Sequence, residues 1–144
     1  MRTALDTNVI SALWSREPLA GRLSVVLGQA HGAGALVICG PVYAELLAHP
    51  LAEEAFVHRF LTDTHIRVDF DLDEGIWRRA GQGFSAYAKR RRSSGGGEPR
   101  RLLVDFLVGA HAEGRAERLL TLDASRYLQD FPELKLMEVE STVR

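Results

Sequence analysis

The sequence has one cysteine, no long hydrophobic run and almost no net charge, and each absence excludes a class of protein. The single cysteine, Cys39, cannot form an internal disulfide, so a disulfide-stabilised secreted domain is excluded. No apolar run approaches the roughly 20 residues that a membrane-spanning helix needs, and no signal-peptide pattern opens the chain. A formal net charge of −1 gives no overall attraction to nucleic acid or to a membrane surface. We therefore expect a soluble, cytoplasmic protein in which Cys39 is a buried reduced thiol.

What is present suffices for one globular domain spanning residues 1–144. The chain is 46% hydrophobic and 26% charged, which is typical of a soluble protein with a real core. Apolar runs that are typical of buried strands alternate with segments of helical spacing. The predicted strands are 4–5, 35–39, 66–68, 119–122 and 134–139. This alternation predicts an α/β protein, a three-layer α/β/α sandwich with a mainly parallel central sheet.

Acidic residues stand where three of these strands end. Asp6 and Asp123 directly follow two of the strands, and Glu45 lies in the helix that follows a third. The carboxyl ends of the strands in an open parallel sheet face the ligand crevice, so we expect the three acids to meet there. After Asp6 the chain turns at once into a helix, with Thr7 or Asn8 as the expected N-cap.

A fourth acid, Asp105, interrupts the most apolar helical segment, residues 102–110. An isolated buried charge is costly, so Asp105 needs a partner. One explanation is a salt bridge with Arg101, one turn earlier. The other is that Asp105 joins the three strand-end acids, because clustered carboxylates repel one another unless a cation lies between them. Oxygen-only ligands favour Mg²⁺ or Mn²⁺ over zinc, which predicts a hard-metal site for phosphoryl transfer or hydrolysis.

Four segments carry these acids. They are Leu5-Asp-Thr-Asn-Val9, Tyr43-Ala-Glu-Leu-Leu47, Val104-Asp-Phe-Leu-Val-Gly-Ala110, and Leu120-Thr-Leu-Asp123 followed by Ser125-Arg-Tyr127. In this order and spacing they resemble the PIN domain, and more narrowly the VapC-type toxins of bacterial and archaeal toxin–antitoxin pairs. Each motif alone is weak, but the resemblance spans the chain. It implies a PIN-like sandwich fold and a metal-dependent ribonuclease that cuts single-stranded or structured RNA.

The resemblance also implies a role for each site residue. Asp6 and Asp105 match the principal Mg²⁺ ligands, and Asp123 matches an acid that binds the metal directly or through water. Glu45 matches the acid that orients the attacking water or acts as the base. Polar side chains beside the acids are implied to support them by hydrogen bonds. These supporting residues are Thr7, Asn8 and Thr121. The implied partners are a cognate antitoxin, RNA and a second copy of the chain in a homodimer.

The chain departs from the family pattern in two places. Small residues often follow the third acid of the family, in a run like Asp-x-x-Ile-Ala-Ala, and here Gly109 is expected to leave the same helix face open for metal or phosphate. The loop 93–97 is longer and more basic than expected, with arginines on both sides. We favour contact of this region with the RNA backbone over a merely solvated surface, although it could also bind an acidic antitoxin segment. The arginines concerned are Arg91, Arg92, Arg100 and Arg101.

Several aromatic residues are expected in the core or on a dimer face, namely Trp14, Trp77, Phe56, Phe60 and Phe84.

Three other functions remain open. A phosphoaspartate protein is disfavoured, because a haloacid-dehalogenase-type phosphatase needs a second Asp where this chain has Asn8, and a response-regulator receiver needs an acidic pair before its phosphorylated Asp. A non-catalytic PIN-like binding module is disfavoured because all four acids are present. A PIN nuclease of RNA processing that has no antitoxin is the closest rival to the toxin.

Overall fold

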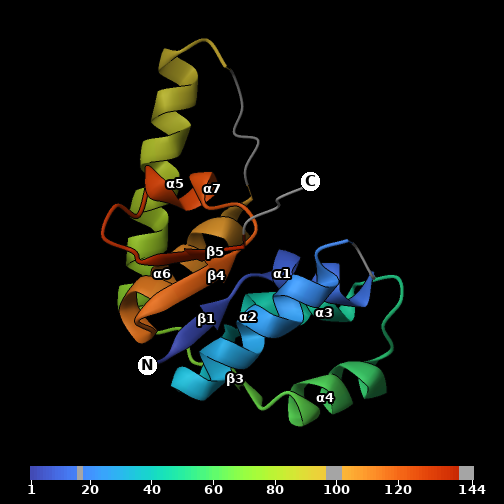
Figure 1. Ribbon diagram of the computed structural model, residues 1–144. Helices are drawn as coiled ribbons and strands as arrows, with labels where there is room; N and C mark the ends of the chain where they lie inside the picture. Colours follow the sequence, from blue (N-terminus) through green and yellow to red (C-terminus); the bar gives the residue numbers. More distant parts are fainter. Residues whose placement is uncertain (16–17, 97–101, 140–144) are drawn as a thin grey trace.

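The computed structural model describes residues 1–15, 18–96 and 102–139, which form a five-stranded sheet with helices on both faces (Figure 1). The strands lie in the order β3-β2-β1-β4-β5, and every neighbouring pair is parallel. This confirms the predicted fold class. The strands are β1 (Thr3–Leu5), β2 (Leu36–Cys39), β3 (Ile66–Asp69), β4 (Arg118–Thr121) and β5 (Leu136–Glu138). Both β1 and β2 are buried along their whole length, as their continuous apolar sequences indicate.

The helices form the two outer layers. They are α1 (Thr7–Trp14), α2 (Ala20–Ala33), α3 (Gly40–Leu47), α4 (Glu54–Asp63), α5 (Glu74–Ser93), α6 (Leu103–Arg115) and α7 (Ser125–Leu128). Helices α1, α2 and α4 lie on one side of the sheet, and α5 and α6 lie on the other (Figure 1). In the described part of the chain, no helix is both long and apolar enough to span a membrane.

The strand order creates a switch point between β1 and β4. From β1 the chain moves outward to β2 and β3, and then crosses back over the sheet to β4 and β5. Because crossovers between parallel strands are right-handed, the helices that connect strands in one direction along the sheet and those that connect strands in the other direction lie on opposite faces. The connections that leave β1 and β4 therefore diverge, and the crevice at a switch point is where open α/β sheets bind ligands.

Helix α6 packs so tightly that it needs a glycine in its middle. A Cβ atom on Gly109 would lie 2.4 Å from Cε2 of Phe131. The expectation that Gly109 keeps a face open for metal or phosphate is therefore wrong, because the space is filled by the ring of Phe131. On the facing helix α5, a Cβ atom on Gly83 would lie 3.2 Å from Cδ1 of Phe106, so a second glycine brings α5 and α6 close together.

The aromatic residues expected in the core or on a dimer face divide between buried and exposed positions. Trp77 is 49% exposed and is not a core residue, because the inward face of its helix belongs to the preceding Ile76. Phe56 is 36% exposed for the same reason, since the next residue, Val57, points into the core. Trp14 packs between α1 and α4, with its ring centroid 5.2 Å from those of both Phe56 and Phe60.

We predict that Gly109→Ala lowers the free energy of unfolding by about 1–3 kcal/mol, the usual cost of overpacking a core. The matched control is Gly114→Ala in the same helix, where the new Cβ would be 3.9 Å from Cγ1 of Ile76. Alanine there should be neutral or stabilising by up to about 1 kcal/mol, because alanine favours helix over glycine. Urea denaturation measures both variants, and equal stability of the two would contradict the packing account.

Candidate active site

Asp6 ends β1 and also caps α1. Its backbone is extended, with φ −79° and ψ 154°, and its Oδ1 accepts a hydrogen bond from the backbone N–H of Thr7 at 2.8 Å. The prediction that Thr7 or Asn8 is the N-cap was wrong by one or two residues, because Asp6 is the single residue between the strand and the helix and takes the cap position itself. The Asp6 side chain is only 5% exposed, so its carboxylate lies inside the protein.

Two hydroxyl groups hold the second oxygen of Asp6. Thr121, at the end of β4, donates from Oγ1 at 2.9 Å, and Tyr127 in α7 donates from its phenol at 2.7 Å. Thr121 Oγ1 also accepts a bond from the backbone N–H of Asp123 at 3.1 Å. Asn8 accepts from the backbone N–H of Leu122 at 3.2 Å through its Oδ1. These bonds join the carboxyl ends of β1 and β4 across the switch point.

Glu45 is brought to the same place by α3. Thr7 Oγ1 donates to Glu45 Oε1 at 2.6 Å, so the polar residue after Asp6 links β1 to the helix that follows β2. Thr7 and Thr121 are thus hydrogen-bonded to acids, and Asn8 is hydrogen-bonded to the segment between β4 and Asp123.

Arg126 lies between the other two acids. Its Nη1 is 3.3 Å from Asp105 Oδ1, and its Nε is 3.3 Å from Asp123 Oδ2. Ser125 donates to the other oxygen of Asp123 at 2.9 Å. Arg101, the expected partner of Asp105, lies outside the described residues.

Sequence reasoning did not assign roles to Arg126 and Tyr127, although both stand in a quoted motif. Arg126 had a usable signal, because a residue three positions after an acid at the start of a helix lies on the same side as that acid. Tyr127 had none, because only the tertiary packing of α7 directs its hydroxyl group at Asp6.

Burial and like charge act together on Asp6. Burial raises the pKa of its carboxyl group, hydrogen bonds from Tyr127, Thr121 and Thr7 oppose this, and the negative charge of Asp105 raises it further. Asp6 and Asp105 are thus close enough to repel each other. Burial raises the pKa of the Cys39 thiol to about 11, with smaller contributions from Asp6 and Glu45. Cys39 therefore remains a buried, protonated thiol, as predicted.

The comparisons with known proteins agree with this geometry. The family model for the PIN domain matches residues 3–132. This chain belongs to the PIN domain family. No curated protein matches the sequence significantly.

Three solved structures share the PIN fold with this chain. VapBC2 from Rickettsia felis, bound to a DNA fragment from its promoter, has 18% identity and a TM-score of 0.68, over 97% of this chain and 100% of that chain. VapBC-1 from nontypeable Haemophilus influenzae has 22% identity and a TM-score of 0.64, over 96% and 98%. FitAcB from Neisseria gonorrhoeae has 19% identity and a TM-score of 0.63, over 94% and 96%. At these identities the likeness establishes the fold.

The donor chemistry of this PIN domain fits a hard divalent cation. All four acids offer oxygen atoms, which Mg²⁺ and Mn²⁺ prefer, and the repulsion between Asp6 and Asp105 favours a cation between them. Among the described residues, no group of three or more Asp, Glu, His or Cys side chains is already arranged around a common metal position. Arg126 lies between Asp105 and Asp123, so these two carboxylates share a protein cation.

The four acids Asp6, Glu45, Asp105 and Asp123 are called the carboxylate cluster below. Neighbouring acids and bases lie outside this cluster and neutralise one another. His111 Nε2 is 3.0 Å from Asp69 Oδ2, and Arg115 contacts both Asp69 at 3.2 Å and Asp73 at 2.9 Å. His111 is therefore engaged away from Asp105.

The predicted RNA-binding arginines are only partly covered by the structure. Arg91 and Arg92 lie in the last turn of α5, which projects beyond the body of the molecule (Figure 1). Arg91 donates to the backbone oxygen of Gly96, and Arg92 is exposed. Arg100 and Arg101 fall outside the described residues.

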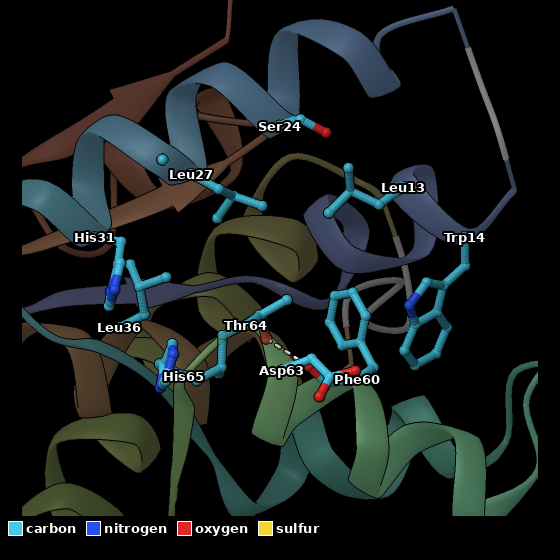
Figure 2. A pocket seen from close by; sticks show the side chains of 12 residues that line it. Leu13, Trp14, Ser24, Leu27, His31, Leu36, Phe60, Asp63, Thr64 and His65 are labelled. Carbon is cyan, nitrogen blue, oxygen red and sulfur yellow. Dashed lines mark hydrogen bonds between the residues drawn. The ribbon is translucent and has the colours of Figure 1, made fainter.

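A separate apolar pocket of about 480 Å³ lies on the side of α1, α2 and α4. Figure 2 shows Trp14 and Phe60 at one end of it, and His31 and His65 at the other. Its described lining residues include none of the four acids. The carboxylate cluster and this pocket are therefore different sites.

The raised pKa of Asp6 predicts how stability depends on pH in the absence of metal. An ordinary Asp titrates near pH 3.9, and a higher folded-state pKa means that folding takes up a proton in the interval above that value. Stability then falls as the pH rises. We predict that the unfolding free energy of the wild type, minus that of Asp6→Asn, decreases from about pH 4 toward neutrality, in urea denaturation with EDTA.

The control is Asp73→Asn, for which the slope should have the opposite sign. A bond from the backbone N–H of Ile76, together with Arg115, holds the pKa of Asp73 below its usual range. The stabilisation that the Asp73 carboxylate gives to the folded state is present above the ordinary Asp pKa and is lost as the pH falls. Parallel slopes for the two variants would contradict the assignment of Asp6 as a destabilised buried carboxylate.

Proposed function

We propose that this PIN domain is a metal-dependent endoribonuclease that hydrolyses RNA phosphodiester bonds at the carboxylate cluster. The observation that carries the proposal is the buried carboxylate of Asp6, which is hydrogen-bonded to Tyr127, next to the Arg126 that contacts Asp105 and Asp123. Carboxylates gathered in this way destabilise the metal-free fold, and a cation-dependent reaction gives a reason to keep them. Membership of the PIN family makes nuclease chemistry the natural use of such a site and argues against the phosphoaspartate alternatives.

Each acid has a distinct role in the proposed reaction. Asp6, Asp105 and Asp123 would hold Mg²⁺, with Mn²⁺ as the alternative. The bound metal would supply Lewis acidity at the phosphoryl group and lower the pKa of the attacking water. Glu45 would accept the proton of that water, and Thr7 would fix the orientation of Glu45 through its 2.6 Å hydrogen bond. Thr121 would keep Asp6 in place.

The basic end of α5 supports RNA as the substrate. Helices α5 and α6 run antiparallel, since Gly83 faces Phe106 and Gly114 faces Ile76. At a rise of 1.5 Å per residue, Arg91 and Arg92 lie about 12 Å beyond Gly83, on the side of α6 where Asp105 stands. We propose that these arginines contact the RNA backbone beside the site, and that Arg100 and Arg101 take part in the same contact.

We further propose that the nuclease is the toxin of a toxin–antitoxin pair. The motifs resemble VapC-type toxins, and two of the similar structures are VapBC complexes. A cognate antitoxin would then be its protein partner. A nuclease of RNA processing without an antitoxin remains the alternative, and the homodimer and the cytoplasmic location remain predictions.

We predict that the purified protein cleaves single-stranded RNA with Mg²⁺ or Mn²⁺ and loses this activity in EDTA. Asp6→Asn and Asp105→Asn should each lower the cleavage rate by at least about a hundredfold, because each removes a metal ligand. The matched control is Asp71→Asn, an exposed acid outside the cluster, which should cleave like the wild type. Equal cleavage by Asp6→Asn and wild type would refute the proposed site.

The same variants separate a toxin from a processing enzyme in cells. Induced wild-type protein should arrest growth and leave discrete RNA fragments, whereas Asp6→Asn should do neither. Co-expression of the cognate antitoxin should restore growth. If the wild type cleaves RNA in vitro but is harmless in cells, the processing alternative is favoured.

We predict that Arg91→Gln combined with Arg92→Gln raises the KM for RNA several-fold and leaves kcat within about twofold, because backbone contacts hold the substrate without taking part in the chemistry. The control is Arg78→Gln, an exposed arginine near the other end of α5 that pairs with Glu74. Steady-state cleavage at two salt concentrations measures the effect. An unchanged KM would show that the basic end of α5 faces solvent and does not contact the RNA.

A further inference from the structure

The carboxylate cluster already contains a cation, and that cation belongs to the protein. Arg126 contacts Asp105 through Nη1 and Asp123 through Nε, both at 3.3 Å. We propose that Arg126 is the resident counter-cation of this site, and that a divalent metal binds by exchange with its guanidinium group. The inference rests on the proposed function, because it takes the clustered carboxylates as the metal ligands.

The position of Arg126 fits a counter-cation better than an ordinary surface ion pair. Its guanidinium group bridges two acids from different elements, Asp105 in the first turn of α6 and Asp123 after β4. Burial opposes the charge on Arg126, but the attraction of Asp105, Asp123 and more weakly Asp6 outweighs it and raises the pKa of Arg126. Four acids with a formal charge of −4 are thereby reduced to −3 without any metal.

A metal ion and the guanidinium group of Arg126 cannot both lie between Asp105 and Asp123. One oxygen of Asp123 contacts Arg126 at 3.3 Å and the other accepts a hydrogen bond from Ser125 at 2.9 Å, so a metal would have to compete with a protein donor at either oxygen. Mg²⁺ needs oxygen ligands at about 2.0–2.1 Å in a nearly octahedral arrangement. Two cations at one pair of carboxylates also repel each other strongly. Metal binding at Asp105 and Asp123 therefore requires the Arg126 side chain to move away.

The surroundings of Arg126 allow it to leave without unfolding the site. Its side chain is 38% exposed and has a route to solvent. The adjacent Tyr127 is fully buried and is held by its 2.7 Å bond to Asp6. The backbone of α7 can thus stay in place while only the arginine side chain swings outward.

The exchange makes a prediction about metal affinity that is independent of cleavage. Arg126→Gln should bind Mn²⁺ at least about tenfold more tightly than the wild type, since the competing charge is gone. Loss of the free Mn²⁺ signal in electron paramagnetic resonance measures binding of the metal alone. Arg78→Gln removes one positive charge at a distance and should bind Mn²⁺ like the wild type. Adding Asp6→Asn to Arg126→Gln should abolish the gain.

The outcomes separate this inference from the proposed function. If binding depends on Asp6 but Arg126→Gln binds Mn²⁺ equally or more weakly, the exchange is wrong and Arg126 instead supports the metal ligands. If none of the variants, nor the wild type, binds Mn²⁺ in a way that depends on Asp6, both the exchange and the metal basis of the proposed function fail.

A measurement on the wild type covers the case in which Arg126→Gln does not fold. The ¹⁵Nε–Hε resonance of Arg126, assigned by its loss in Arg126→Lys, reports whether the guanidinium group is held by carboxylates. Titration with diamagnetic Mg²⁺ should shift this resonance toward that of a solvated arginine. A resonance that stays unchanged while Mg²⁺ saturates the site would overturn the exchange.

Discussion

The site depends on one buried carboxylate. Asp6 is almost inaccessible to solvent, yet it receives hydrogen bonds from the start of α1, the end of β4 and the middle of α7. Burying a charge in this way is unfavourable unless donors or a cation compensate for it. The three donors compensate only in part, because the pKa of Asp6 remains raised. The part of the burial cost that the donors do not offset favours the binding of positive charge at the carboxyl ends of β1 and β4.

The fold determines where this unfavourable negative charge is placed. The switch point of the parallel sheet lies between β1 and β4, the place where open α/β sheets bind ligands, and Asp6 and Asp123 stand just after these two strands. Thr7 and Thr121 are the links, since one bonds to Glu45 and the other bonds to both Asp6 and the segment that carries Asp123. Changes to these small polar residues would act on the acids by moving them.

The sequence predicted the architecture because the architecture follows from local patterns. Apolar runs that end at acids, such as those before Asp6 and Asp123, indicate buried strands, and the structure has those strands. The same patterns single out the four acids as candidate site residues. Features that depend on tertiary packing could not be predicted. Gly109 looked like an opening toward the site, but the space beside it is filled by Phe131, which is 22 residues later in the chain. Trp77 could equally be a core or a dimer-face residue from the sequence, and only the structure shows that its neighbour Ile76 takes the inward position.

Arg126 and Tyr127 illustrate the same limit at the site itself. Their place after Asp123 is visible in the sequence, but their partners Asp105 and Asp6 are distant in the chain and become neighbours only when α7 packs against the sheet. The candidate site therefore consists of the acids and of the groups that hold them in place.

We expect the four carboxylates to form a cation site at the switch point. A crystal of the protein soaked in Mn²⁺, with anomalous scattering recorded at the manganese absorption edge, shows whether they do. We predict one anomalous peak within coordination distance of Asp6 and Asp105, on the side of Asp123, with the Arg126 side chain turned toward solvent. A peak elsewhere, or no peak beside Asp6 at a concentration that saturates Mn²⁺ binding in solution, would rule out this site.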